Sequence, residues 1–169
     1  MPINSKQKGN TFELKVAKML SDWSGEKFHR TPMSGALHWA NDTRVISDIV
    51  PPQSLVDKGW PFSIECKKTE TSWEISAFLD GTSPFWKQWQ QCWDDAQREQ
   101  MKALLVFNKN YRDIYTAMTL EVFNSLDIKI EHTIILQCQG WNLIIMKFGD
   151  ILQSISCEDL LAKNILKKF

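Results

Sequence analysis

The feature that most limits the possible folds is the run Phe62–Lys68, an apolar stretch interrupted at alternate positions by Glu65 and Lys67. Side chains of a β-strand alternate between its two faces, so a strand here puts Glu65 and Lys67 on the face opposite Ile64. An acid and an amine then lie side by side on an otherwise apolar strand. Any fold that buries this strand must also give the two charged groups a partner.

A second acid, Asp48, lies near the end of the preceding apolar run, Val45–Val50, which we also expect to form a strand. The two runs are joined by a loop rich in proline and glycine, residues 51–61, so they can lie next to each other. Asp48 and Glu65 can then converge on one divalent cation, with Lys67 beside it. Two carboxylates at an open site suit Mg²⁺, which keeps several waters and is commonly completed by substrate phosphate. The alternative is a surface strand that carries an ordinary Glu/Lys pair.

Length, charge and cysteine spacing limit the class of protein. The 169 residues are sufficient for one domain with a substantial core, and we expect residues 1–169 to form it. Basic and acidic residues number 20 each, so the net charge is zero; this disfavours a protein that coats nucleic acid, but it allows a local basic patch. The four cysteines form no C-x-x-C pair, which predicts cytosolic thiols rather than a zinc site or disulfides. No apolar run approaches the ~20 residues of a membrane span, so we expect no membrane partner.

The first helix is expected from Asn10 or Thr11 to about Ser24, because apolar residues recur there at helical spacing. Glu13 falls at the edge of the apolar stripe. A carboxylate beside a core needs a cation, a metal or the water shell of a metal as its partner. Alternatively, Glu13 in the first turn stabilises the N-terminal end of the helix dipole. The sequence leaves both interpretations open.

Residues 26–44 are rich in polar and turn-forming side chains. Ser34–Gly35 can present backbone N–H groups to a phosphate, because glycine allows close approach. The alternative is a plain surface loop, and we expect solvated or hydrogen-bonded side chains for His29 and His38.

A second helix is expected from Pro84 to about Gln100, with Ser83 as its N-cap. Its apolar stripe has the spacing of a buried face, so we expect its tryptophans to pack in the core. Gln88 and Gln91 lie away from this stripe and can face a polar cleft. Stacking on unpaired bases is the alternative for three tryptophans in polar or turn-rich segments: Trp39, Trp60 and Trp73.

The rest of the chain predicts a mixed α/β fold. The run 101–107 follows the second helix, so the order strand, helix, strand over 62–107 predicts a crossover unit. Further strands are expected at 114–120, 130–137 and 141–148, with a hairpin turn at Gln139–Gly140, one helical turn at 121–126, and a closing helix over 160–169 opened by Ser156. We therefore expect a central mixed β-sheet flanked by helices.

In chain order, Glu13, Asp48 and the triplet Glu65-Cys66-Lys67 resemble the PD-(D/E)XK nuclease superfamily. The pattern Lys8-Gly9-x-x-x-Glu13 and the Ser34–Gly35 loop are similar to those of archaeal-type Holliday junction resolvases and their phage-encoded relatives. The resemblance covers about residues 6–108 and implies a restriction-endonuclease-like core, with a β-rich tail and C-terminal helix over 109–169.

Gln91-Cys92 is similar to the glutamine-bearing helix that follows the E-x-K strand in many of these nucleases, and Gln88 is a competing match. The chain departs from the family pattern in two respects. Ser47 stands where the superfamily usually has proline before the acid, and the net charge is neutral rather than basic.

The resemblance implies that Asp48, Glu65 and the Cys66 backbone carbonyl bind Mg²⁺, for which Mn²⁺ would substitute. Glu13 would hold the metal directly, through water, or as a ligand of a second metal. Lys67 would orient the attacking water or the scissile phosphate, and Gln91 would place one of the two. Contacts with backbone phosphates are expected from four residues: Lys8, Arg30, Ser34 and Lys68.

The implied activity is Mg²⁺-dependent cleavage of DNA, most specifically of four-way junctions. Two paired cuts on a two-fold-symmetric substrate need two sites related in the same way, so the resemblance implies a homodimer. We expect it to act in the cytoplasm of a bacterium or of a phage-infected host. The alternatives are another nuclease of the superfamily, of the flap, nicking or restriction type, and a non-catalytic DNA-binding module of the same fold.

Overall fold

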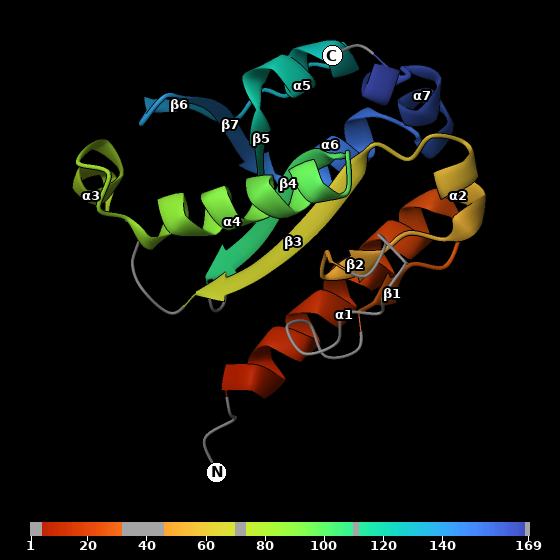
Figure 1. The fold of residues 1–169 in the computed structure, drawn as a ribbon, viewed down its shortest axis with the longest axis horizontal. Coiled ribbons are helices and arrows are strands. Elements are labelled where there is room, and N and C mark those ends of the chain that lie inside the picture. The colour runs from red at the N-terminus through yellow and green to blue at the C-terminus, as the bar shows by residue number, and fades with distance from the viewer. Residues whose placement is uncertain (1–4, 32–45, 70–73, 110–111, 168–169) are drawn as a thin grey trace.

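A seven-stranded β-sheet organises the protein, as a computed structural model describes it over residues 5–31, 46–69, 74–109 and 112–167 (Figure 1). The strands are β1 (His29–Arg30), β2 (Ile49–Val50), β3 (Phe62–Thr69), β4 (Lys102–Lys109), β5 (Ile114–Thr119), β6 (Thr133–Cys138) and β7 (Trp141–Lys147). Their order across the sheet is β1-β2-β3-β4-β5-β7-β6. The helices are α1 (Ser5–Ser24), α2 (Gln53–Asp57), α3 (Ile75–Leu79), α4 (Pro84–Arg98), α5 (Leu120–Leu126), α6 (Phe148–Ser154) and α7 (Cys157–Ala162), followed by the 3₁₀ helix η2 (Ile165–Lys167).

The centre of the sheet is the parallel pair β3 and β4, joined by α4. All other neighbouring strands are antiparallel. A parallel pair needs a crossover connection, and the helix from Pro84 supplies it, with the Ser83 hydroxyl accepting a hydrogen bond from the Phe85 N–H. The predicted crossover unit, the helix that forms it and the mixed α/β class are therefore confirmed.

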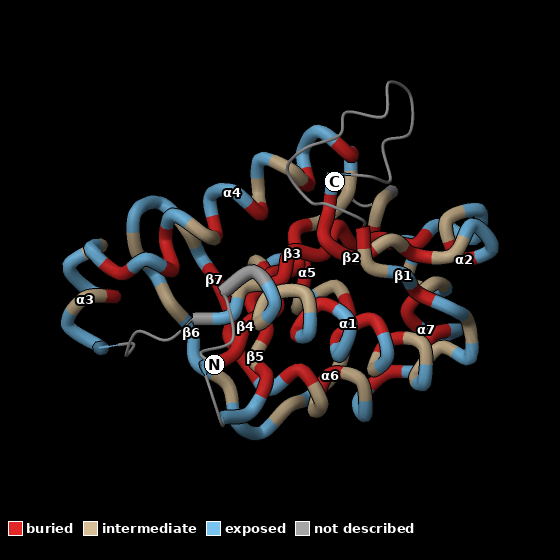
Figure 2. Tube along the Cα trace, turned by 90° about the horizontal axis from the view of Figure 1, so that it is seen from below, coloured by how far each residue is buried: buried red, intermediate tan, exposed pale blue. Residues whose placement is uncertain are grey.

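Helices cover both faces of the sheet and form an apolar cluster on each. Ile64 and Cys66 of β3 lie in the cluster packed by α1, whereas Leu105 and Phe107 of β4 lie in the cluster packed by α4. The central strands β3, β4 and β5 are buried in the middle of the molecule, while α1 and α4 are buried along one side only (Figure 2). Because side chains alternate along β3, the odd-numbered Glu65 faces α4, as the alternation predicts.

The run Val45–Val50 was expected to be a strand, but among its described residues only Ile49 and Val50 pair with neighbouring strands, and Ile46–Asp48 form a bend. The bend arises because the backbone of Ser47 bonds to side chains rather than to a strand. Its N–H donates to the Glu99 carboxylate, and its carbonyl accepts from the Thr31 hydroxyl.

The first helix begins at Ser5 rather than at Asn10 or Thr11. The Thr11 hydroxyl donates to the carbonyl of Gln7, one turn earlier, and so lies within the helix instead of capping it. The predicted loop at 51–61 contains the short helix α2, which the flanking prolines and glycine concealed.

The C-terminal part differs from the predicted single helix over 160–169. Helix α6 was not expected; it buries Phe148 and Ile151. Ser156 caps α7 as predicted, since its hydroxyl accepts from the Asp159 N–H, but the helix then ends at Ala162. Asn164 takes a left-handed conformation with φ of 49°, which stops the helix. The expected hairpin turn at 139–140 is confirmed, with positive φ at both residues.

The tryptophans described by the structure mainly serve the core. Trp86 and Trp89 are buried under α4, as predicted. Trp60 is also buried and donates its indole N–H to the Phe62 carbonyl, so base stacking by this residue is wrong. Trp39 and Trp73 lie outside the described residues. The four cysteines are free thiols, and no helix in the described ranges has the length and apolar character needed to cross a membrane.

Replacing Leu105 by alanine tests the central position of β4. Leu105 is fully buried between α4 and the sheet. The substitution leaves a cavity and should lower the free energy of unfolding by about 2–5 kcal/mol, measured by urea denaturation. The matched control is Leu14→Ala on α1, where the side chain is 59% exposed; it should change stability by no more than about 0.5 kcal/mol. Equal effects of the two substitutions would contradict this packing.

Candidate active site

Asp48 is held against β3 by both its backbone and its side chain. Its N–H donates to the Ile64 carbonyl at 3.1 Å, and its carbonyl accepts from the Thr31 N–H at 2.9 Å. Its carboxylate oxygen Oδ2 accepts a hydrogen bond from the Cys66 N–H at 2.8 Å. Asp48 is 17 residues before Glu65 in the sequence, yet it contacts the E-x-K strand directly, as expected.

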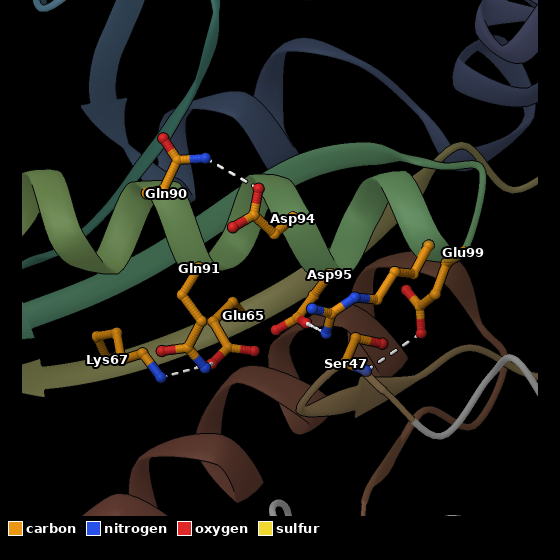
Figure 3. Close-up of polar contacts among 9 residues, drawn as sticks. Ser47, Glu65, Lys67, Gln90, Gln91, Asp94, Asp95 and Glu99 are labelled. Carbon is orange, nitrogen blue, oxygen red and sulfur yellow. Dashed lines mark hydrogen bonds and ion pairs between the residues drawn. The ribbon is translucent and has the colours of Figure 1, made fainter.

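Glu65, Lys67 and Gln91 form a second group on the α4 side of β3 (Figure 3). The Lys67 ammonium lies 2.5 Å from Glu65 Oε1, and the Gln91 amide donates to the same oxygen at 3.1 Å. The Glu65 side chain is buried, and Lys67 is partly exposed. Of the two candidate glutamines, Gln91 is the one that contacts the acid of the strand. Gln88 is half-buried, and its side-chain oxygen has no hydrogen-bond partner among the described residues.

Glu13 is buried and lies 3.1 Å from the guanidinium of Arg30. Because α1 begins at Ser5, Glu13 is in the third turn, and the interpretation that it stabilises the helix N-terminus is wrong. Burial and the charge of Asp48 raise the pKa of Glu13, while Arg30 and Lys67 act to lower it. Glu13 therefore lies within electrostatic range of both Asp48 and Lys67, and α1 contributes to the same site.

Among the described residues, the negative charge of the three acids in the site exceeds the positive charge of the cations beside them. Burial first, and then the nearby Asp48, raise the pKa of Glu65 to about 8, against the lowering effect of Lys67. Burial acts to lower the pKa of Lys67. The charge and hydrogen bond of Glu65, together with the charge of Asp48, outweigh burial, so the pKa of Lys67 is raised. Among the described residues, the three acids Glu13, Asp48 and Glu65 lie near two cations, Lys67 and Arg30. Lys67 therefore stays protonated near neutral pH, and Glu65 tends to hold a proton.

The donor chemistry suits a hard divalent cation. Within a strand the N–H and C=O of one residue point to the same side, so the Cys66 carbonyl faces the edge where Asp48 lies. Carboxylate and carbonyl oxygens are the ligands that Mg²⁺ takes, and a cation would relieve the excess negative charge. As the side chains stand, no three His, Cys, Asp or Glu among the described residues are placed to enclose a metal ion, since Glu65 turns to Lys67 and Glu13 to Arg30.

The four residues expected to contact phosphate have different surroundings. Arg30 is engaged with Glu13. Lys68 is exposed and, as an even-numbered residue of β3, points to the α1 side, opposite Lys67. Lys8 is half-buried on α1, the helix that packs on that side. Ser34 and Gly35 lie outside the described residues.

Two residues near the site were not found by sequence reasoning. Thr31 bonds to the backbone of both Ser47 and Asp48, and Glu99 bonds to the Ser47 N–H. Thr31 carries no sequence signal, because a threonine before a proline is common in loops. Glu99 does carry one: it is an acid at the C-terminal end of a helix, where the helix dipole disfavours negative charge.

The sequence matches the family described as "Phage putative PDDEXK endonuclease" over residues 4–162. The chain belongs to this family of phage PD-(D/E)XK endonucleases. It is also 26% identical over 167 residues to Protein D14 of Escherichia phage T5, covering 95% of this chain and 99% of that protein. No solved structure matches the chain. The superfamily resemblance is thereby confirmed, and the family match supports a nuclease.

The raised pKa of Glu65 predicts a pH dependence of stability in the absence of divalent metal. Its pKa is 4.5 in an unconstrained chain and about 8 in the folded protein, so the folded state binds the extra proton between these values. Stability should therefore fall as the pH rises through this window. Glu65→Gln cannot ionise and should lack this loss. In EDTA, the free energy of unfolding of Glu65→Gln relative to that of wild type should rise by at least about 1 kcal/mol from about pH 5 to about pH 9.

The control for this measurement is Glu121→Gln, which changes an exposed glutamate on α5 far along the chain. It should follow the wild-type pH profile. Parallel profiles for wild type and Glu65→Gln would show that Glu65 is not destabilised by burial and by Asp48.

Proposed function

We propose that this protein is a metal-dependent endodeoxyribonuclease, and most specifically a Holliday junction resolvase. The observation that carries the proposal is the contact between Asp48 and the E-x-K strand, with Glu65 and Lys67 adjacent on that strand. The family match and the convergence of Glu13 on the same charges support the chemistry. The junction preference is supported by the resemblance of Lys8-Gly9-x-x-x-Glu13 to archaeal-type resolvases.

Asp48, Glu65 and the Cys66 carbonyl would hold Mg²⁺ or Mn²⁺, and Glu13 would support it directly, through water, or at a second metal. When bound, such a metal lowers the pKa of its water and neutralises charge that develops on the phosphate. Overall, one water is consumed: its oxygen bonds to phosphorus, the bond to the 3′-oxygen breaks, and that oxygen takes a proton. The products are a 5′-phosphate and a 3′-hydroxyl.

Lys67 and Gln91 would act as hydrogen-bond donors in this reaction. Because Glu65 and Asp48 raise the pKa of Lys67, its ammonium remains charged and suits stabilisation of a phosphate rather than removal of a proton from water. Gln91 donates to Glu65 and can orient the acid or a neighbouring water. Lys8, Ser34 and Lys68 are proposed contacts for DNA phosphates away from the cleaved bond; Arg30 would chiefly neutralise Glu13.

A resolvase would act as a homodimer, and β6 is the candidate interface. This strand forms one edge of the sheet, contains no charged residue, and exposes Ile134 and Ile135 by 59% and 54%, on opposite faces. Edge strands without charges or prolines tend to pair with another chain, and a second β6 would cover both isoleucines. Light scattering at the concentration of the cleavage assay measures the mass. We place such an enzyme in the cytoplasm of a phage-infected bacterium.

Asp48→Asn tests the site assignment. The substitution keeps the size of the side chain but removes a charged metal ligand, so cleavage should fall by at least about 100-fold, more than the usual loss for residues that only support ligands. The assay uses a labelled four-way DNA junction beside linear duplex of the same sequence, with Mg²⁺ and with EDTA. Asp94→Asn, on the exposed side of α4, is the matched control and should cleave like wild type.

Symmetric paired nicks on the junction alone, lost in EDTA and in Asp48→Asn, are the expected result. Equal cutting of duplex and junction would support a nuclease but contradict a resolvase, and would favour an enzyme of the flap, nicking or restriction type. Mg²⁺-dependent cleavage retained by Asp48→Asn would refute the assignment of the site. A wild-type protein that binds DNA but cuts neither substrate would support a non-catalytic module.

A further inference from the structure

Glu99 connects the end of α4 to the bend that carries Asp48 (Figure 3). The residue directly follows α4 and is only 8% exposed. Its carboxylate oxygen Oε1 accepts a hydrogen bond from the Ser47 N–H at 3.2 Å. The other oxygen, Oε2, is buried. The Ser63 hydroxyl and the Ile46 N–H also favour the charged form of Glu99.

The local environment of Glu99 disfavours a carboxylate in two ways. Burial penalises the charge and raises the pKa of Glu99 despite the Ser63, Ser47 and Ile46 groups. The position at the C-terminal end of α4 adds repulsion from the helix carbonyls. A residue that conflicts with its local surroundings is expected where a contact elsewhere compensates. The contact in the structure is with Ser47, next to Asp48.

The bend is held from three directions, and Glu99 supplies one of them. Thr31 holds the carbonyls of Ser47 and Asp48, and β3 holds the N–H of Asp48 through Ile64. The Ser47 N–H is held from the side of α4, by Glu99. Without that carboxylate a buried N–H would lose its partner, and the bend would have to move to find another. Asp48 would move with it, away from the Cys66 N–H.

We propose that Glu99 is a positioning residue: by fixing the Ser47 N–H it sets the orientation of Asp48 and thereby the metal affinity of the site. The inference rests on the proposed metal-dependent nuclease. Glu99 contacts neither the metal nor the substrate in this account, and acts through the backbone of one neighbouring residue. It also links α4, which carries Gln91, to the turn that carries Asp48.

Glu99→Gln is the test variant, because it preserves size while removing the charge and leaving one neutral oxygen, which is a weaker acceptor for the Ser47 N–H. Mn²⁺ binding, measured by titration calorimetry without DNA, should weaken by about 10- to 100-fold, as for other residues that orient metal ligands. In cleavage assays the Mg²⁺ concentration for half-maximal activity should rise by a similar factor, with a smaller loss of rate at saturating Mg²⁺. Glu99→Ala should show the same pattern, at least as strongly.

Asp94→Asn is the matched control, since it makes the same change on α4 at an exposed residue that accepts a hydrogen bond from Gln90, outside the candidate site. It should bind Mn²⁺ like wild type. Melting temperatures in EDTA separate lost stability from lost metal affinity, and Glu99→Gln decides the question if Glu99→Ala does not fold. Mn²⁺ affinity within twofold of wild type in a folded Glu99→Gln would overturn the inference while leaving the nuclease intact. A wild-type protein that binds no Mn²⁺ would instead overturn the proposed function.

Discussion

The hydrogen bond from the Cys66 N–H to the Asp48 carboxylate is the interaction on which the candidate site depends. It joins the bend before β2 to the central strand β3 and so brings two acids from separate segments to one place. Among the described residues, β2 pairs with β3 at Ile49 and Ile64 alone, and the Cys66 N–H bonds to the Asp48 side chain instead of to a strand. The parallel pair β3 and β4, covered by helices on both faces, provides the rigid support.

Charge balance explains why the acids are arranged as they are. Glu65 and Asp48 repel each other in a poorly solvated position, and Lys67 compensates only part of their charge. In the absence of a metal, a proton on Glu65 restores neutrality, and Glu13 is compensated by Arg30. A divalent cation would take the place of that proton, so its binding should release protons and strengthen as the pH rises. The site is thus destabilising for the fold and suited to a cation, as functional sites often are.

The parts of the fold that were predicted correctly are those governed by strong periodicity. The alternation around Glu65 fixed the faces of β3, and the aromatic stripe after Ser83 identified α4 and its buried side. The predicted meeting of Asp48 and β3 is present in the geometry, because a short connection limits how far the two segments can separate. The roles of these residues in catalysis stay predictions.

The errors lie where side chains compete with the backbone. The backbone of Ser47 bonds to the side chains of Glu99 and Thr31, so the observed strand is shorter than expected. These partners are 52 and 16 positions away in the sequence, and no local sequence pattern predicts such contacts. The end of α1 at Ser24 was predicted correctly, but its start was placed too late. Helix α6 was missed and the end of α7 was misplaced, because short helices depend on packing more than on propensity. Glu99 was missed because its importance is set by what it touches, although its unfavourable place at a helix end was visible in the sequence.

The most direct test of the account is anomalous diffraction from crystals of the wild-type protein soaked in Mn²⁺. We expect an anomalous peak at coordination distance from Asp48, Glu65 and the Cys66 carbonyl, with the Glu65 side chain turned away from Lys67 to reach it. A protein that cleaves DNA in Mn²⁺ but shows its anomalous peak elsewhere, with Asp48 and Glu65 unliganded, would contradict it.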